Sequence, residues 1–145
     1  MKMNSRNLLA FLATITLASP LAMSSAQEGE AQLTVKQVMN GIITPMTNTI
    51  WGAYQLQTDA QWQEVEHAAL TVIAAGQVLA SGGAGPGEAE MADQLAWQEY
   101  NNQMIAAARA VIEAVAARDE EALSAAGNDQ LYPPCESCHQ QYQSR

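Results

Sequence analysis

The chain has 145 residues, of which 15 are acidic and six are basic, so its formal net charge is −9 at pH 7. This balance argues against nucleic acid or an anionic membrane surface as a partner, because both require a basic face. The absence of any alternating run of Val, Ile and Thr also argues against β-strands.

The first 26 residues have the pattern of a secretory signal peptide. Lys2 and Arg6 precede an apolar run that starts at Leu8, and small residues end the segment at Ala26. The run is shorter than the roughly 20 residues that a spanning helix needs. We therefore expect cleavage after Ala26, export, and no stable membrane insertion of the mature protein. An uncleaved N-terminal anchor is the alternative.

The remaining residues, 27–145, are expected to form one domain with a hydrophobic core. They contain four basic against 15 acidic residues, a formal charge of −11. Such a charge steers a basic protein partner toward the chain, although it also simply keeps an exported protein in solution.

Two helical segments are predicted in the first half of this domain. Residues 33–57 space their apolar side chains three or four apart, which is the period of an amphipathic helix. Gly41 and Pro45 predict a kink inside that helix. The second segment begins after Thr58, a favourable N-cap residue, and ends at the Gly-rich loop 81–87.

Two more helical segments are predicted in the second half. Residues 88–117 contain strong helix formers without Gly or Pro, which predicts one continuous helix. The fourth segment starts at Asp119, and Pro133 and Pro134 predict a break after Ala126, an extended turn and a fresh short helix. Four amphipathic helices with short connections predict an all-α antiparallel four-helix bundle.

The chemistry-bearing motif stands near the C-terminus, where Cys135 and Cys138 are the only cysteines and His139 follows the second. A zinc site needs a fourth ligand, and the only other histidine is His67. A redox dithiol of the thioredoxin type needs a βαβ pattern that this chain lacks, and a disulfide would close too small a loop to add much stability. Covalent haem attachment uses both thiols, which add to porphyrin vinyl groups, and the adjacent histidine, which reaches the iron.

In this context the chain resembles the class II c-type cytochromes, of which cytochrome c prime is the best-known branch. The resemblance covers the four-helix architecture, and its motif is Cys135-Glu136-Ser137-Cys138-His139 with Tyr142 three residues later. It implies a periplasmic electron-transfer protein, not an enzyme, that is often a homodimer. One haem c would lie at one end of the bundle, with Cys135 and Cys138 as thioether anchors and His139 as the proximal iron ligand.

The other face of the iron is predicted from bundle topology, which places Met39, the loop 81–87 and Met91 at the haem end. A thioether is a good axial ligand, so we predict Met39 as the distal ligand, with Met91 and Met46 as alternatives. Each of these methionines could instead fill core space.

The resemblance leaves two functions open. Family members with methionine on the first helix are six-coordinate and transfer electrons, whereas those with an apolar residue there are five-coordinate and bind gases such as NO or CO. We predict electron transfer with a redox protein partner, and gas binding is the alternative. A third possibility is an exported helical interaction module whose cysteine pair is oxidised.

Overall fold

A computed structural model describes residues 33–143, which are mostly helical and contain no β-strand. The prediction of an all-α fold is therefore confirmed for this part of the chain. The predicted signal peptide, residues 1–26, lies outside the described residues. None of the helices formed by residues 33–143 is long and apolar enough to span a membrane.

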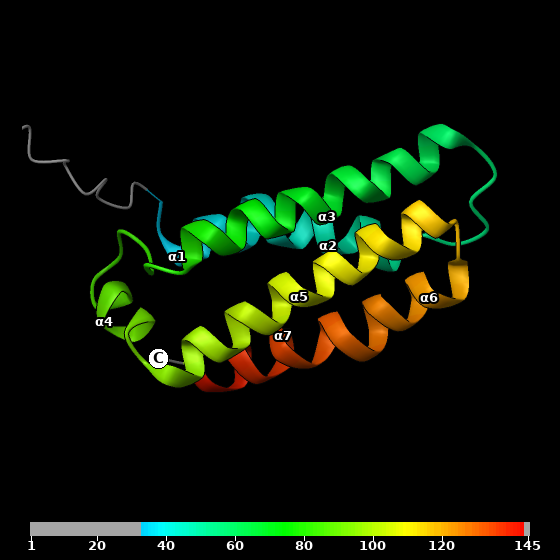
Figure 1. The fold of residues 1–145 in the computed structure, drawn as a ribbon. Coiled ribbons are helices and arrows are strands. Elements are labelled where there is room, and N and C mark those ends of the chain that lie inside the picture. The colour runs from blue at the N-terminus through cyan, green and yellow to red at the C-terminus, as the bar shows by residue number, and fades with distance from the viewer. Residues whose placement is uncertain (1–32, 144–145) are drawn as a thin grey trace, which may run out of the picture.

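Helical structure occurs in five stretches of the chain, residues 35–51, 59–79, 88–92, 95–117 and 120–143 (Figure 1). Short π-helical segments, in which the backbone turn is wider than in an α-helix, interrupt the first and last stretches. The elements in chain order are α1 (Val35–Val38), η1 (Met39–Ile43), α2 (Thr44–Trp51), α3 (Asp59–Leu79), α4 (Glu88–Ala92), α5 (Leu95–Ala117), α6 (Glu120–Ala125), η2 (Ala126–Leu131), α7 (Tyr132–Cys138) and η3 (His139–Gln143).

The helix starts follow the predicted capping chemistry. The Thr58 hydroxyl accepts a hydrogen bond from the Gln61 backbone N–H, and the Gln61 side chain in turn accepts from the Thr58 N–H, which completes a capping box. Asp119 accepts from the Ala122 N–H at 2.9 Å and starts α6. In the first stretch the irregularity predicted at Gly41 and Pro45 takes the form of η1, with the proline in the first turn of α2.

The prediction of one continuous helix over residues 88–117 is wrong, because the chain leaves the helical conformation between α4 and α5. Gln94 has an extended backbone, with φ −76° and ψ 136°. Tertiary hydrogen bonds stabilise this break: Gln98 Nε2 donates to the carbonyls of Ala80 and Ala92, and the Tyr142 hydroxyl donates to Gln94. These contacts outweigh the local helix propensity.

The extended turn predicted after Ala126 is also absent. The chain continues through the π-helical segment η2 directly into α7, whose first turn contains Pro133 and Pro134. A proline ring crowds the preceding helical turn and cannot donate an N–H. We attribute the uninterrupted course to η2, since its wider turn accommodates the prolines without an extended connection.

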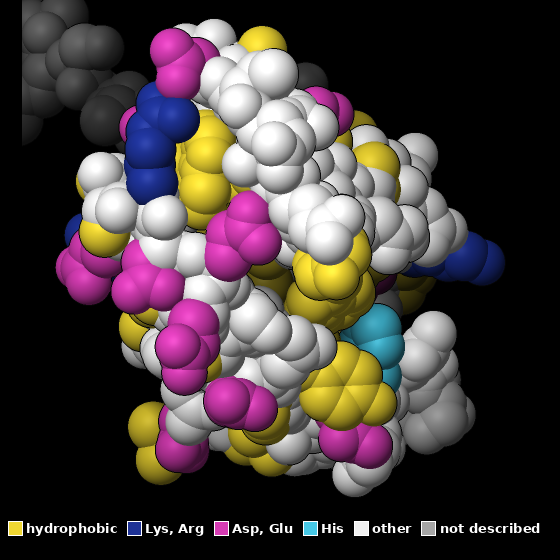
Figure 2. All heavy atoms as spheres, turned by 90° about the vertical axis from the view of Figure 1, so that its right-hand side faces the viewer, with side chains coloured by type: hydrophobic (Ala, Val, Ile, Leu, Met, Phe, Trp, Pro, Cys, Tyr) yellow, Lys and Arg dark blue, Asp and Glu magenta, His cyan; other side chains and the backbone are white. Residues whose placement is uncertain are grey.

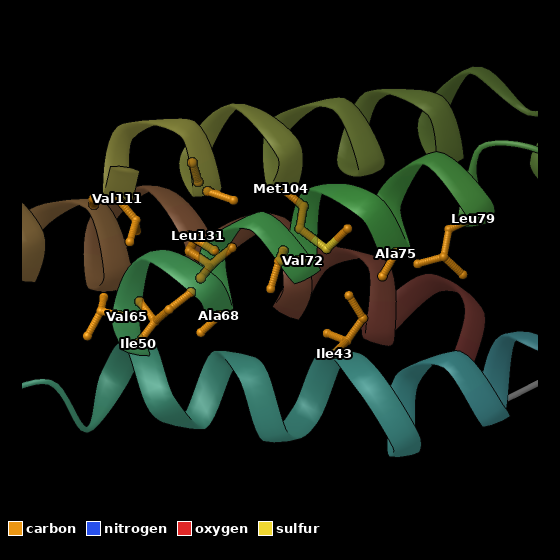
Figure 3. Close-up of a cluster of buried hydrophobic side chains, with 14 of the residues drawn as sticks. Ile43, Ile50, Val65, Ala68, Val72, Ala75, Leu79, Met104, Val111 and Leu131 are labelled. Atoms are coloured by element: carbon orange, nitrogen blue, oxygen red, sulfur yellow. The ribbon is translucent and has the colours of Figure 1, made fainter. Parts of the chain in front are cut away.

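The helices pack through small and β-branched side chains (Figure 3). The α3 helix packs against both α2 and α5, and α5 also packs against η2 and α7. At Gly76 α3 lies close to α5, because a Cβ atom there would lie 2.6 Å from Cγ1 of Ile105. Fully buried core residues include Ala69, Val72, Ala108, Val111 and Leu131.

Several elements meet at one end of the molecule, where α1 begins, α3 ends, α5 begins and η3 ends (Figure 1). The Glu88 carboxylate accepts from the Val35 N–H at 2.9 Å, and the Trp97 indole donates to the Leu79 carbonyl at 2.8 Å. The Tyr142 hydroxyl reaches Gln94 at 3.0 Å. The prediction that Met39, the loop 81–87 and Met91 share one end of the molecule depends on this arrangement of the helix ends.

Candidate functional site

A pocket of about 130 Å³ extends between the first helical stretch, the start of α5 and α7. This volume lies below the roughly 300–1,000 Å³ that is typical of small-molecule and cofactor sites, so only part of a large ligand fits inside it. Apolar and aromatic side chains dominate its lining, which contains no Asp, Glu, Lys or Arg. Such a lining suits an apolar group better than a charged substrate.

All four residues predicted as cofactor-binding or iron-binding line this pocket: Met39, Cys135, Cys138 and His139. Met39 comes from the first helical stretch and the other three come from the last, so tertiary packing brings them together. Met39 and His139 are each the first residue of a π-helical segment, η1 and η3. π-Helical turns inside helices occur frequently at functional sites.

The two cysteine thiols are unpaired and partly buried. Burial raises the pKa of Cys135 to about 11, with repulsion from Cys138 adding to the effect and a backbone hydrogen bond opposing it. Burial also raises the pKa of Cys138. Both thiols are therefore protonated at neutral pH, whereas the reactive cysteine of a redox dithiol has a lowered pKa. The raised pKa values of both thiols argue against a redox dithiol.

His67 lies far from the cysteine motif, on an exposed face of α3. It lines a separate surface hollow together with Met46 and Glu64. It therefore does not supply the fourth ligand that a zinc site at Cys135, Cys138 and His139 would need. Within residues 33–143 no cluster of three or more His, Cys, Asp or Glu side chains is arranged to hold a metal ion.

Of the three methionines predicted as possible iron ligands, only Met39 lines the pocket. Met91 packs against the core and Met46 lines the hollow beside His67, so neither alternative ligand reaches the pocket. The loop 81–87 lies at the predicted end but does not line the pocket either. Met104 on α5 does line it and is 5% exposed, which the sequence interpretation missed. The pocket thus contains two thioethers, from Met39 and Met104.

Two tryptophans form part of the pocket wall. Trp97 is 3% exposed, and its indole is fixed by the hydrogen bond to Leu79. Trp51 is 39% exposed, and its indole donates to the Gly127 carbonyl at 3.0 Å. Both side chains shape the pocket, and Trp97 is also part of the buried core.

Asn101 brings an unsatisfied polar atom to the pocket lining. Its Nδ2 donates to the Gly76 carbonyl at 2.9 Å, whereas its Oδ1 is buried and has no hydrogen-bond partner in the described part of the chain. The bond to Gly76 fixes the amide orientation, since a flipped amide would set two oxygens against each other. A buried acceptor without a donor is unfavourable, so Oδ1 indicates a place for a water molecule or for a ligand N–H or O–H group.

A chain of hydrogen bonds holds the segment that follows His139. Tyr100 donates to Gln141, Gln141 donates to Tyr142, and Tyr142 donates to Gln94, over distances of 3.0–3.2 Å. The Tyr142 ring also meets Trp97 edge-on, with ring centroids 5.2 Å apart. These contacts fix η3 against α5 and restrict the backbone that carries His139. The His139 side chain itself is exposed, as are Thr44 and Asn48, and these three residues mark the mouth of the pocket.

Comparison of the chain with protein-family models, with curated proteins and with solved structures finds no match. The functional interpretation therefore depends on the sequence motif and on the pocket. The motif specifies reactive groups, and the pocket specifies the kind of molecule that fits between them.

Proposed function

We propose that this chain is a periplasmic c-type cytochrome of the class II kind, an antiparallel four-helix bundle that carries one covalently bound haem c and transfers electrons. The observation that carries the proposal is the common pocket. Met39 and the motif Cys135, Cys138 and His139 come from opposite ends of the mature chain, yet all four line one largely apolar pocket.

The residues present fit a haem group. Cys135 and Cys138 would form the two thioether bonds, and His139 would ligate the iron from one side. Met39 would supply the thioether ligand on the other side. When bound, haem iron supplies a one-electron redox centre whose potential depends on its axial ligands and on the polarity around it.

Several of the remaining lining residues would give the group an apolar environment. Ile43, Leu79 and Trp97 are buried at 5%, 2% and 3% exposure and form an apolar wall of the pocket. The hydrogen-bond chain from Tyr100 to Gln94 holds Gln141 and Tyr142 and so restricts the backbone of η3, which begins at His139. A rigid iron environment favours electron transfer, because little rearrangement accompanies the change of charge.

The proposal requires no substrate and no catalytic group. The pocket lining contains no carboxylate and no lysine, so His139 and the two thiols are its titratable groups apart from Tyr100. In this proposal His139 and both cysteines are occupied by the cofactor. A role as an enzyme is therefore not proposed.

The test is periplasmic expression of the full chain in a host with a haem-maturation system, followed by intact-mass measurement and absorption spectroscopy. We expect the mass of one haem to remain attached after denaturation, and no thiol to react with an alkylating reagent. Reduced protein should show sharp low-spin bands that carbon monoxide leaves nearly unchanged. Cys138→Ala should lose the second thioether bond, and Met46→Leu, outside the pocket, should keep the parent spectrum.

Two other results would change the conclusion. A colourless but folded protein from the haem-maturing host would remove the haem proposal and restore the interaction module with an oxidised cysteine pair. A high-spin spectrum that shifts on addition of carbon monoxide would indicate an open sixth position. Gas binding would then be the leading function, with Met39 as a packing residue.

A further inference from the structure

We propose that the rim of the pocket between α2 and α7 is the docking surface for a basic protein that exchanges electrons with this chain. The proposal rests on the function proposed above for its redox step, whereas docking itself can be measured separately. Four residues define the surface, which we call the acidic aromatic rim: Trp51, Tyr132, Asp129 and Glu136.

The aromatic part of the rim is held in place and reaches the solvent. Trp51 and Tyr132 are 39% and 50% exposed, and their rings meet edge-on with centroids 6.3 Å apart. The hydrogen bond from the Trp51 indole to Gly127 fixes the Trp51 ring between α2 and η2, and Tyr132 follows at the start of α7. Exposed, preorganised Trp and Tyr side chains are the residue types that contribute most to protein–protein affinity. Trp51 also lines the pocket, so the pair connects the pocket to the surface.

The charged part of the rim is acidic only. Asp129 precedes Tyr132 by three residues and Glu136 follows it by four, and residues at these spacings are neighbours on a helix surface. All three side chains are exposed, so they lie on one solvent-facing side of the last helical stretch. Residues 119–143 contain no Lys or Arg, and residues 37–58, which include α2, carry no charge at all. In the described residues the single ion pair is Arg118 with Asp59, so neither rim carboxylate is neutralised by a cation.

Charge complementarity identifies the occupant. A second copy of this acidic chain and a nucleic acid would both be repelled, whereas a Lys-rich or Arg-rich protein face would be attracted. Lys or Arg side chains of the partner could also lie over the exposed rings of Trp51 and Tyr132. Figure 2 faces the end of the helical core at the right of Figure 1, opposite the end where the chain terminus lies, and acidic side chains lie beside hydrophobic ones over that face.

The experiment compares two double variants that remove the same two negative charges. Asp129→Asn with Glu136→Gln changes the rim, and Glu64→Gln with Glu66→Gln changes α3 away from the pocket mouth. For each holoprotein, the second-order rate of oxidation is measured with a cationic hexaammine complex and with anionic hexacyanoferrate at low ionic strength. We expect the rim variant to slow the cationic reaction by roughly threefold to tenfold and to accelerate the anionic one, and the α3 variant to change each rate by less than about twofold.

Binding is measured independently of haem, by titrating the protein with a Lys-rich peptide and following backbone NMR shifts. We expect shifts on α2 and α7, weaker binding of the peptide by the rim variant, and an affinity about fivefold lower after Tyr132→Ala, which lies outside the pocket lining. Equal responses of the rim and α3 variants, or no response of either, would overturn the proposal. A colourless protein that still binds the peptide at the rim would contradict the haem proposal and leave the docking surface in place.

Discussion

The two ends of the helical core are built differently. At the end away from the candidate site, the chain is closed by short polar contacts: Glu120 accepts from the backbone N–H groups of Gln55 and Leu56, at 3.3 and 2.6 Å, and Arg118 pairs with Asp59. The Arg118 guanidinium also lies 6.0 Å from the Trp62 ring centroid. Each helix there starts or stops at a recognisable cap, and the backbone polar groups find partners nearby.

At the site end the same helices depart from regular geometry. Two π-helical segments begin at Met39 and His139, α4 is separated from α5, and Asn101 keeps a buried oxygen without a partner. Met39, His139 and Asn101 line the pocket, whereas the irregularities of the capped end are single residues with positive φ, Gln55 at 51° and Arg118 at 53°. The difference indicates that the capped end stabilises the fold and that the irregular end makes room for a ligand, at some cost in stability.

Removing the thioether of Met39 should produce the largest change in the site. Met39→Leu keeps the volume and apolar character of the side chain, so the thermal midpoint should shift little. If Met39 ligates the iron, the reduced protein should become high-spin and carbon-monoxide-reactive. Met104→Leu is the matched control within the same pocket, and an unchanged spectrum in Met39→Leu with an altered one in Met104→Leu would reassign the ligand to Met104.

A larger side chain at Gly76, where α3 packs closely against α5, should destabilise the core between the two ends. Gly76→Val would drive side-chain atoms into Ile105, and we expect a loss of about 2–3 kcal/mol in the free energy of unfolding, measured with denaturant. The control is Gly41→Ala, because a Cβ atom there meets nothing within 4 Å. That variant should gain stability or stay neutral. A fully stable Gly76→Val protein would show that the two helices can separate freely.

In the haem-free form, the buried thiols should make the free energy of unfolding depend on pH in the alkaline range. Burial raises the pKa of Cys135 from 9.0 to about 11, so the folded protein retains a proton that the unfolded chain releases. Stability is therefore full below about pH 9 and falls as the pH rises toward 11. Thermal midpoints over this range should fall less steeply in Cys135→Ser. A parallel decline in both proteins would show that other groups, such as tyrosines, dominate.

The smallest effect is expected at the capped end. Asp119→Ala removes the acceptor for the Ala122 N–H and should reduce the free energy of unfolding by about 1 kcal/mol. Its absorption spectrum as holoprotein should remain that of the parent, because the change is remote from the pocket. Asp119→Asn, which keeps an accepting oxygen, should recover most of the lost stability. A spectral change in Asp119→Ala would mean that a substitution at the capped end alters the environment of the haem.

Local sequence signals predict the parts of the molecule that local chemistry decides. The cap at Thr58, the start of the fourth segment at Asp119 and the helical conformation of the first, second and fourth segments are confirmed, whereas the third segment is divided into α4 and α5. Met39 meets the C-terminal motif because short connections make successive helices reverse direction, so distant segments share an end. The roles of Met39, Cys135, Cys138 and His139 toward haem remain predictions.

Other features depend on contacts that no local pattern encodes. The break between α4 and α5 results from side-chain hydrogen bonds made by Gln98 and Tyr142, which come from outside it. Met104 follows the same apolar period as its buried neighbours, so periodicity could not separate a pocket residue from a core residue. Asn101 was the available signal: an amide within an apolar stripe, three residues before Met104, indicates a polar requirement inside the packing.

The π-helical segment η2 lies between Asp119 and the cysteine motif, so the number of residues in η2 affects how the motif is placed. A π-helical turn holds about one residue more than an α-helical turn. Deletion of a single residue within 126–131 would therefore convert this turn to regular α-helix and keep Cys135, Cys138 and His139 on the same side of the helical core. Pro133 and Pro134 would then crowd the preceding turn, so the deletion would cost stability without redirecting the motif. The same deletion within a regular α-helical stretch would rotate everything after it by about 100°.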